Sequence, residues 1–239
     1  MTIDPLHDPM GQAVLDYCEG KPTKKLRVLS SMFDDDEMPV PYLFRTYDQM
    51  PAIEQTALDS ARGKVLDIGA CAGCHSLCLQ NRGFDVTAID ISPLSVETMK
   101  KRGIRKALLA DIFEQNLGSE YDTILLLMNG TTIAGTLERL PLLFQRLKAL
   151  IAPNGQILID SSDLRYIYDD EDGNFDYDDT KYYGEVDYRM QYGKIKGKRF
   201  DCLYVDPATM SQCATNEGLC PQILVQNEDY SYLMRLTIA

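Results

Sequence analysis

Short apolar runs alternate with amphipathic stretches between residues 63 and 160, a pattern typical of strands and helices in an α/β domain. The expected strands cover residues 64–69, 84–90, 106–111, 121–130 and 156–160. The expected helices cover residues 74–82, 93–101 and 136–151, each between two of these strands. Strands that alternate with helices run parallel, so the pattern predicts a doubly wound sheet. The run 121–130 is apolar throughout, which places that strand at the centre.

The end of the chain has a different pattern. A helix is expected over residues 207–217, and two apolar runs, 222–229 and 230–238, follow with almost nothing between them. Such a pair predicts an antiparallel hairpin. Together with the five core strands, the hairpin predicts a seven-stranded, mostly parallel sheet.

Two further segments flank this core and are expected to fold over it. The first contains an amphipathic helix at 11–18 and an acidic turn at 33–41. The second is rich in Tyr and Asp, with strands expected at 185–192 and 199–205. At 239 residues the chain suits a single domain. Its expected parts are an N-terminal cap (1–60), a core (61–160), a Tyr/Asp-rich insertion or lid (161–205) and a C-terminal helix and β-hairpin (206–239).

The charge of the chain narrows its partners and its location. It carries 36 acidic and 24 basic residues, a net charge of −12, which repels nucleic acids and anionic membranes. The first residues lack the basic and apolar regions of a signal peptide, and no run is long enough to span a membrane. We therefore expect a cytoplasmic protein, a monomer or homodimer, whose seven cysteines are reduced thiols.

The first strand leads into the turn Asp67-Ile-Gly69-Ala-Cys71-Ala-Gly73. A dinucleotide fingerprint needs glycines at 69, 71 and 74, and two of these positions hold Cys. The stretch also contains C-x-x-C-H, which is the spelling of a covalent haem site, but haem attachment belongs to exported chains. The spacing of its cysteines fits neither common zinc nor iron–sulfur patterns. No metal site is expected here.

Four motifs in order resemble those of the class I S-adenosylmethionine (SAM) dependent methyltransferases. They are "LDIGACAG", "VTAIDIS", "LLADIF" and "YDTILLLMNG", and the terminal hairpin resembles the antiparallel seventh strand of that family. The resemblance implies a Rossmann-like methyltransferase fold, SAM as cofactor and S-adenosyl-L-homocysteine (SAH) as product.

The resemblance also implies roles for individual residues. Asp90 is placed to hold the ribose hydroxyls, and Asp111 is placed for the adenine amino group. The family usually has Gly where Cys71 stands, so this side chain must point away from the cofactor or narrow its cradle. The implied cofactor contacts are Asp67, Gly69, Ala70, Cys71, Gly73, Asp90, Ile91, Ala110, Asp111, Ile112, Met128 and Asn129.

Three further residues are candidates for the methionine carboxylate of SAM. His75 lies at a helix start, where free N–H groups favour an anion, although a local cap or polar contact explains it equally well. Arg45 and Tyr42 lie upstream, where related small-molecule methyltransferases often supply such a contact. Helix capping or a surface ion pair is the alternative for Arg45.

The motif "MNG" at the end of the fourth strand concerns the methyl acceptor. It differs from the (D/N)-P-P-Y of methyltransferases that act on DNA bases and glutamine amides, so we expect a small-molecule acceptor. Asn129, Asp163 and Tyr183 are the candidate catalytic residues, with Asp163 as base, although methyl transfer does not require a base. A turn cap for Asp163 and core packing for Tyr183 are the alternatives.

Other functions also fit parts of the sequence. They are an aminopropyl transferase that uses a decarboxylated donor, an NAD oxidoreductase, a SAM-binding protein without catalysis, and a metal or redox protein built on the cysteines.

Overall fold

A computed structural model describes residues 2–114, 117–170, 175–177 and 181–238. Its main sheet has seven strands in the order β11-β12-β7-β6-β3-β4-β5, which confirms the predicted fold class. Strands β3 to β7 are parallel, and β12 runs antiparallel to both β7 and β11. The strands are β3 (Lys64–Ile68), β4 (Asp85–Asp90), β5 (Ala107–Leu109), β6 (Tyr121–Leu126), β7 (Ile151–Ser162), β11 (Leu219–Gln226) and β12 (Ser231–Ile238).

Helices cover both faces of this sheet, because successive residues of each buried strand point to opposite sides. Val65 of β3 packs in one cluster with Leu79 of α3, whereas the next residue, Leu66, packs in another with Leu147 of α5 and Met210 of α6. The helices of the main domain are α2 (Ala52–Ser60), α3 (Cys74–Asn81), α4 (Pro93–Lys101), α5 (Leu140–Leu150) and α6 (Pro207–Asn216).

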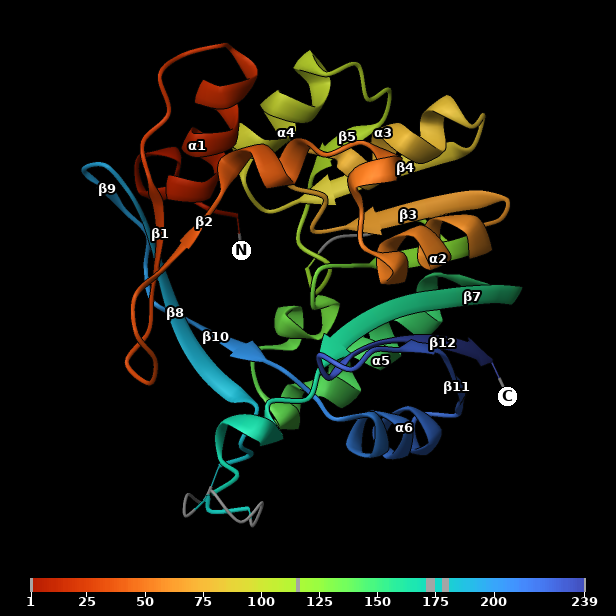
Figure 1. The fold of residues 1–239 in the computed structure, drawn as a ribbon. Helices are drawn as coiled ribbons and strands as arrows, with labels where there is room; N and C mark the ends of the chain where they lie inside the picture. Colours follow the sequence, from red (N-terminus) through yellow and green to blue (C-terminus); the bar gives the residue numbers. More distant parts are fainter. Residues whose placement is uncertain (1, 115–116, 171–174, 178–180, 239) are drawn as a thin grey trace.

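A second, antiparallel sheet joins the N-terminal segment to the Tyr/Asp-rich insertion. Its order is β10-β8-β1-β2, with β9 on β8, and Leu26 of β1 pairs with Tyr192 of β8. Helix α1 packs on it through Ala13. The arrowheads of β3 and β7 in Figure 1 point toward this sheet, so it faces the carboxyl ends of the parallel strands. Its elements are β1 (Leu26–Leu29), β2 (Asp36–Met38), β8 (Glu185–Tyr192), β9 (Ile195–Lys196), β10 (Phe200–Leu203) and α1 (Pro9–Cys18).

Several predicted elements and boundaries differ from the structure. The acidic turn at 33–41 contains strand β2, which pairs with β1, and neither strand has a strong apolar pattern. The helix expected at 136–151 begins at Leu140, because Pro141 suits the first helical turn. The turn expected after Ile151 is a bulge within β7. The 3₁₀-helices are Pro5–His7, Val40–Phe44, Tyr47–Gln49, Gly130–Ala134, Leu137–Arg139 and Arg165–Ile167.

Candidate functional site

The turn after β3 has the backbone of a glycine loop even where it holds cysteine. Gly69, Cys71 and Gly73 have φ angles of 72°, 50° and 76°, all in the left-handed region that favours glycine. A Cβ on Gly73 would lie 2.2 Å from Ile104 Cδ1, so only glycine fits there without movement. Cys71 therefore adopts the conformation of the Gly that the resemblance expects, and its side chain packs in a cluster with Leu43.

Substitutions at Cys71 test whether backbone or thiol matters. We expect Cys71→Gly to keep SAH affinity and to change the free energy of unfolding by less than about 1 kcal/mol, because relieved strain offsets greater backbone entropy. Cys71→Val places a β-branched residue at positive φ and should cost about 2 kcal/mol of stability and about tenfold in SAH affinity. Urea unfolding and calorimetric titration measure both effects. Equal behaviour of the two variants would contradict this account.

Asp90 lies at the end of β4 and ties this turn to the next helix. Cys71 N donates to its Oδ2 at 2.8 Å, and Ser92 N donates to its Oδ1 at 2.8 Å. Burial raises the pKa of Asp90 from 3.8 to about 6, although both hydrogen bonds oppose that shift. The carboxylate is therefore ionised at neutral pH, and each oxygen keeps a further lone pair for a hydroxyl donor.

The residues before β1 are held next to Asp90, at the carboxyl ends of the parallel strands. Ser92 Oγ donates to Asp8, whose other oxygen accepts Gly11 N at 2.8 Å and so caps α1. Ile3 N donates to the carbonyl oxygen of Ile91 at 2.9 Å. These contacts hold α1 beside Asp90.

The remaining residues expected around the cofactor differ in exposure. Asp67 is buried and accepts a 2.6 Å hydrogen bond from Ser76 Oγ. Ala70, Ala110 and Ile112 are buried, whereas Ile91 has 39% of its surface exposed. Asp111 Oδ1 accepts the N–H of Phe113 at 2.9 Å. The structure thus brings the ends of β3, β4 and β5 to one edge, as expected of parallel strands.

The end of β6 departs from the prediction. The strand stops at Leu126 instead of continuing to 130, because Met128 and Asn129 adopt φ angles of 67° and 60°. The carboxylate of Asp160, at the end of β7, holds this turn by accepting Met128 N at 3.1 Å and Gly130 N at 2.9 Å. Two adjacent left-handed residues that are not glycine store backbone strain, which is common at functional sites.

A buried ion cluster links the N-terminal segment to α3. Glu54 on α2 contacts the guanidinium of Arg45 through both carboxylate oxygens, and one of them lies 2.6 Å from His75 Nε2. Burial alone would raise the pKa of Glu54, but His75 and Arg45 hold it below its usual value. Burial would lower the pKa of His75, but Cys74 and Glu54 raise it well above its usual value. With His75 protonated, the cluster carries one net positive charge.

This cluster contradicts the alternative of a surface ion pair for Arg45, because the Arg45 side chain is buried. Its guanidinium lies over the Tyr42 ring, 4.0 Å from the centroid, and donates to the Tyr42 carbonyl oxygen. Sequence reasoning missed Glu54, and it gave Asp160 as a candidate on the acceptor side instead of as the support of the turn after β6. Glu54 lies on a helix that was not predicted, and nothing in its neighbourhood marks it as the partner of His75, 21 residues away.

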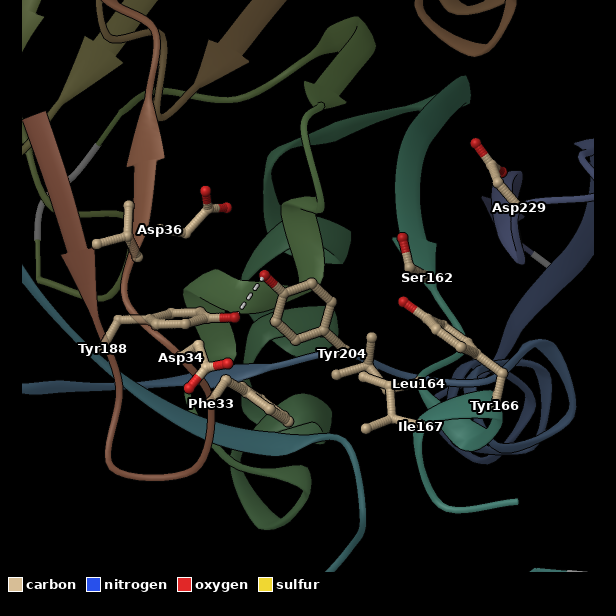
Figure 2. Close-up of a pocket in the computed structure, with 11 residues that line it drawn as sticks. Phe33, Asp34, Asp36, Ser162, Leu164, Tyr166, Ile167, Tyr188, Tyr204 and Asp229 are labelled. Carbon is tan, nitrogen blue, oxygen red and sulfur yellow. Dashed lines mark hydrogen bonds between the residues drawn. The ribbon is translucent and has the colours of Figure 1, made fainter. Parts of the chain in front are cut away.

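A cavity of about 350 Å³ lies between the second sheet and the end of β7. Figure 2 shows Asp34, Asp36 and Tyr188 on one side, Ser162 and Asp229 on the other, and Tyr204 between them. Ser162 Oγ donates to Asn129 Oδ1 at 2.8 Å, so the cavity wall is joined directly to the strained turn after β6. The lining residues are Val28, Phe33, Asp34, Asp36, Ser162, Leu164, Tyr166, Ile167, Tyr188, Tyr204 and Asp229.

Two of the candidate catalytic residues meet beside this cavity. Tyr183 Oη donates to Asp163 Oδ1 at 2.8 Å, and Asp163 Oδ1 also accepts Arg165 N at 2.9 Å. Burial is the main cause that raises the pKa of Tyr183, so its phenol stays protonated. Ser162 and Leu164, on either side of Asp163, line the cavity, whereas Asp163 itself does not.

All seven cysteines are free thiols in the structure. Cys74 packs in a core cluster with Leu79, and Cys78 packs against the same cluster. In the ranges described above, no three or more His, Cys, Asp or Glu side chains form a metal-binding group. The same ranges contain no helix with the length and apolar character that crossing a membrane requires.

Comparison with known proteins places this geometry in a family. The family described as "Methyltransferase domain" matches residues 42–219. The structure of a SAM-dependent methyltransferase from Bacteroides fragilis, in complex with SAH, is 49% identical in sequence, with a TM-score of 0.94. The match covers 100% of this chain and 98% of that one. No curated protein matches the chain in sequence.

More distant structures show the same fold alone. The CcbJ methyltransferase of Streptomyces caelestis is 14% identical, covers 81% of this chain and 94% of its own, and has a TM-score of 0.62. A SAM-dependent methyltransferase from Clostridium acetobutylicum is 14% identical, covers 77% of this chain and 87% of its own, and has a TM-score of 0.57.

Proposed function

Because the chain belongs to the methyltransferase domain family and is a SAM-dependent methyltransferase, we propose that its methyl acceptor is a small molecule. The observation that carries this proposal is the cavity of about 350 Å³, a volume typical of small-ligand sites. The hydrogen bond from Ser162 to Asn129 joins this cavity to the turn after β6, where the family resemblance implies cofactor contacts. The net charge of −12 argues against a nucleic-acid acceptor, and the free thiols suit a cytoplasmic enzyme.

The residues at the strand ends carry the acceptor groups and charges that SAM binding requires. We propose that Asp90 accepts hydrogen bonds from the ribose hydroxyls, because its ionised carboxylate retains acceptor capacity beyond Cys71 N and Ser92 N. The positive cluster of Arg45, Glu54 and His75 is proposed to attract the methionine carboxylate, since opposite charges attract strongly when water is excluded.

SAM supplies a methyl carbon that an acceptor lone pair attacks, so that the new bond forms as the carbon–sulfur bond breaks and its electron pair stays on sulfur, giving SAH. The protein must then align the acceptor, exclude water and remove a proton where the acceptor carries one. We propose that the cavity walls align the acceptor, and that Asp163, in contact with Tyr183, receives the proton.

Substitution of Asp163 tests this assignment. If Asp163 is the base, Asp163→Ala should lower kcat about a hundredfold and leave SAH affinity unchanged. Tyr183→Phe retains the ring, removes the 2.8 Å contact and should change kcat less. If Asp163→Ala turns over at the normal rate, Asp163 is not the base. That result would not contradict the methyltransferase activity itself.

The class of acceptor is tested by following the methyl group. Purified protein is incubated with methyl-labelled SAM and either a dialysed cell extract or its small-molecule fraction. We expect label in the small-molecule fraction, and none with Gly69→Val, which places a β-branched side chain at φ 72° in the cofactor turn. Label retained only on protein or RNA would contradict a small-molecule acceptor.

A further inference from the structure

We infer that the cavity beside β7 binds the acceptor through a protonated amine, so that the acceptor is an organic cation with an apolar or ring-shaped body. This inference rests on the proposed function and names the chemical class of its substrate. It is argued from the charges of the cavity wall, its aromatic surfaces and its place next to Asn129.

The wall of the cavity is anionic. Asp34, Asp36 and Asp229 line it, and no Lys, Arg or His does. Within the described part of the chain, none of these three carboxylates forms an ion pair; Asp36 and Asp229 accept hydrogen bonds from neutral groups close by in sequence. The intervening Asp35 differs, because Arg27 pairs with it at 2.5 Å outside the lining. The cavity therefore concentrates unneutralised negative charge, which attracts cations.

Aromatic rings make up much of the remaining wall. Phe33, Tyr166, Tyr188 and Tyr204 line the cavity, and the hydroxyls of the last two meet at 3.4 Å (Figure 2). Burial raises the pKa of both of these tyrosines, so they remain neutral phenols that add no charge. Aromatic faces attract ammonium groups and pack against ring or alkyl bodies. Carboxylates and rings together select an amine over a neutral or anionic molecule.

The position of Asp34 and Asp36 assigns these two carboxylates to substrate binding, not to activation of the nucleophile. Asp34 and Asp36 lie on the side of the second sheet, across the cavity from Ser162, which contacts Asn129 (Figure 2). A protonated amine has no lone pair and cannot attack a methyl carbon. The ammonium is therefore the anchor, and a second nucleophilic group of the same molecule, toward Ser162, accepts the methyl and then releases its proton.

Binding of three matched probes to the SAH-loaded protein tests the inference. All three probes are phenols with a short side chain in the para position. The side chain of tyramine ends in an ammonium, that of 4-ethylphenol is uncharged, and that of 4-hydroxyphenylacetate ends in a carboxylate. Calorimetric titration should show tyramine binding at least about tenfold tighter than 4-ethylphenol, with the anion weakest. Added salt should weaken only the tyramine complex, because the carboxylates are solvent-exposed. Equal affinity for tyramine and 4-ethylphenol would overturn the inference.

Variants of three consecutive aspartates provide the control. The double substitution Asp34→Asn with Asp36→Asn should reduce tyramine affinity about tenfold and leave that of 4-ethylphenol unchanged. Asp35→Asn, which removes one negative charge outside the cavity, should leave both affinities unchanged. If Asp35→Asn loses as much tyramine affinity as the double variant, the overall negative charge of this surface attracts tyramine, and the inference of an amine site in the cavity is wrong.

The two proposals fail separately. If methyl label enters neutral or anionic metabolites while tyramine does not bind, the amine inference is wrong and the small-molecule acceptor stands. If tyramine binds as expected while label enters only macromolecules, the proposed small-molecule acceptor is wrong and the cation site remains.

Discussion

Asp90→Asn is expected to weaken SAH binding about a hundredfold at pH 7.5, the largest effect on ligand binding that the structure predicts. The ionised carboxylate accepts hydrogen bonds from two N–H groups and keeps lone pairs for two ribose hydroxyls. Asparagine offers only one acceptor oxygen, and its NH2 group would face other hydrogen-bond donors. Calorimetric titration with SAH measures the loss. Asp85→Asn, at the opposite end of β4 where Lys106 pairs with an exposed side chain, is the control and should bind SAH normally.

The same carboxyl predicts a pH dependence. Since burial raises the pKa of Asp90 to about 6, the protein should lose SAH affinity as the pH falls through 6 and that group gains a proton. The folded-state pKa is raised, so the contribution of Asp90 to stability has the opposite sign and decreases as the pH rises from about 4 to 6. Asp90→Asn should therefore bind weakly at every pH with a flatter profile. An unchanged profile in this variant would assign the titration to another group, such as Asp160.

Glu54→Ala is expected to have the largest effect on stability. It leaves Arg45 and His75 buried without their shared carboxylate, and an unpaired buried charge costs about 3–5 kcal/mol. For a protein of this size the loss corresponds to a fall in Tm of about 10 °C. Thermal unfolding followed by circular dichroism measures it.

Asp59→Ala on the same helix is the matched control. Asp59 pairs with Arg82 at 2.8 Å on the surface, so its loss should cost less than about 1 kcal/mol. Similar shifts in Tm for the two variants would mean that the buried cluster does not stabilise the protein more than an exposed pair does.

The parts predicted well are those with local or periodic signals. Strand β4 was predicted at 84–90 and lies at Asp85–Asp90, and α4 begins at Pro93 after the Ser92 cap, as the Ser-Pro pair indicates. Strand β8 was predicted over the residues it occupies. The parts predicted poorly depend on partners elsewhere: strand β2 has three polar or half-buried residues and exists because β1 pairs with it.

The residues of the candidate site also differ in how well the sequence predicts them. The glycine turn and Asp90 follow from sequence, because a turn between a strand and a helix and the residue at a strand end are both set within a few positions of the chain. The pairing of Glu54 with Arg45 and His75, and the support of the turn after β6 by Asp160, depend on contacts between residues from 9 to 32 positions apart in the chain.

By itself the sequence determined the seven-stranded, mostly parallel sheet through its apolar periodicity, and its four motifs, through their resemblance to those of SAM-dependent methyltransferases, indicated the family. Only the tertiary structure decided how the two flanking segments meet. Residues near 30 and residues near 190 form one sheet, and that pairing encloses the cavity lined by Asp34, Tyr188 and Ser162. A cavity between distant segments leaves no periodic signal, since its walls are chosen by packing in space and not by spacing along the chain.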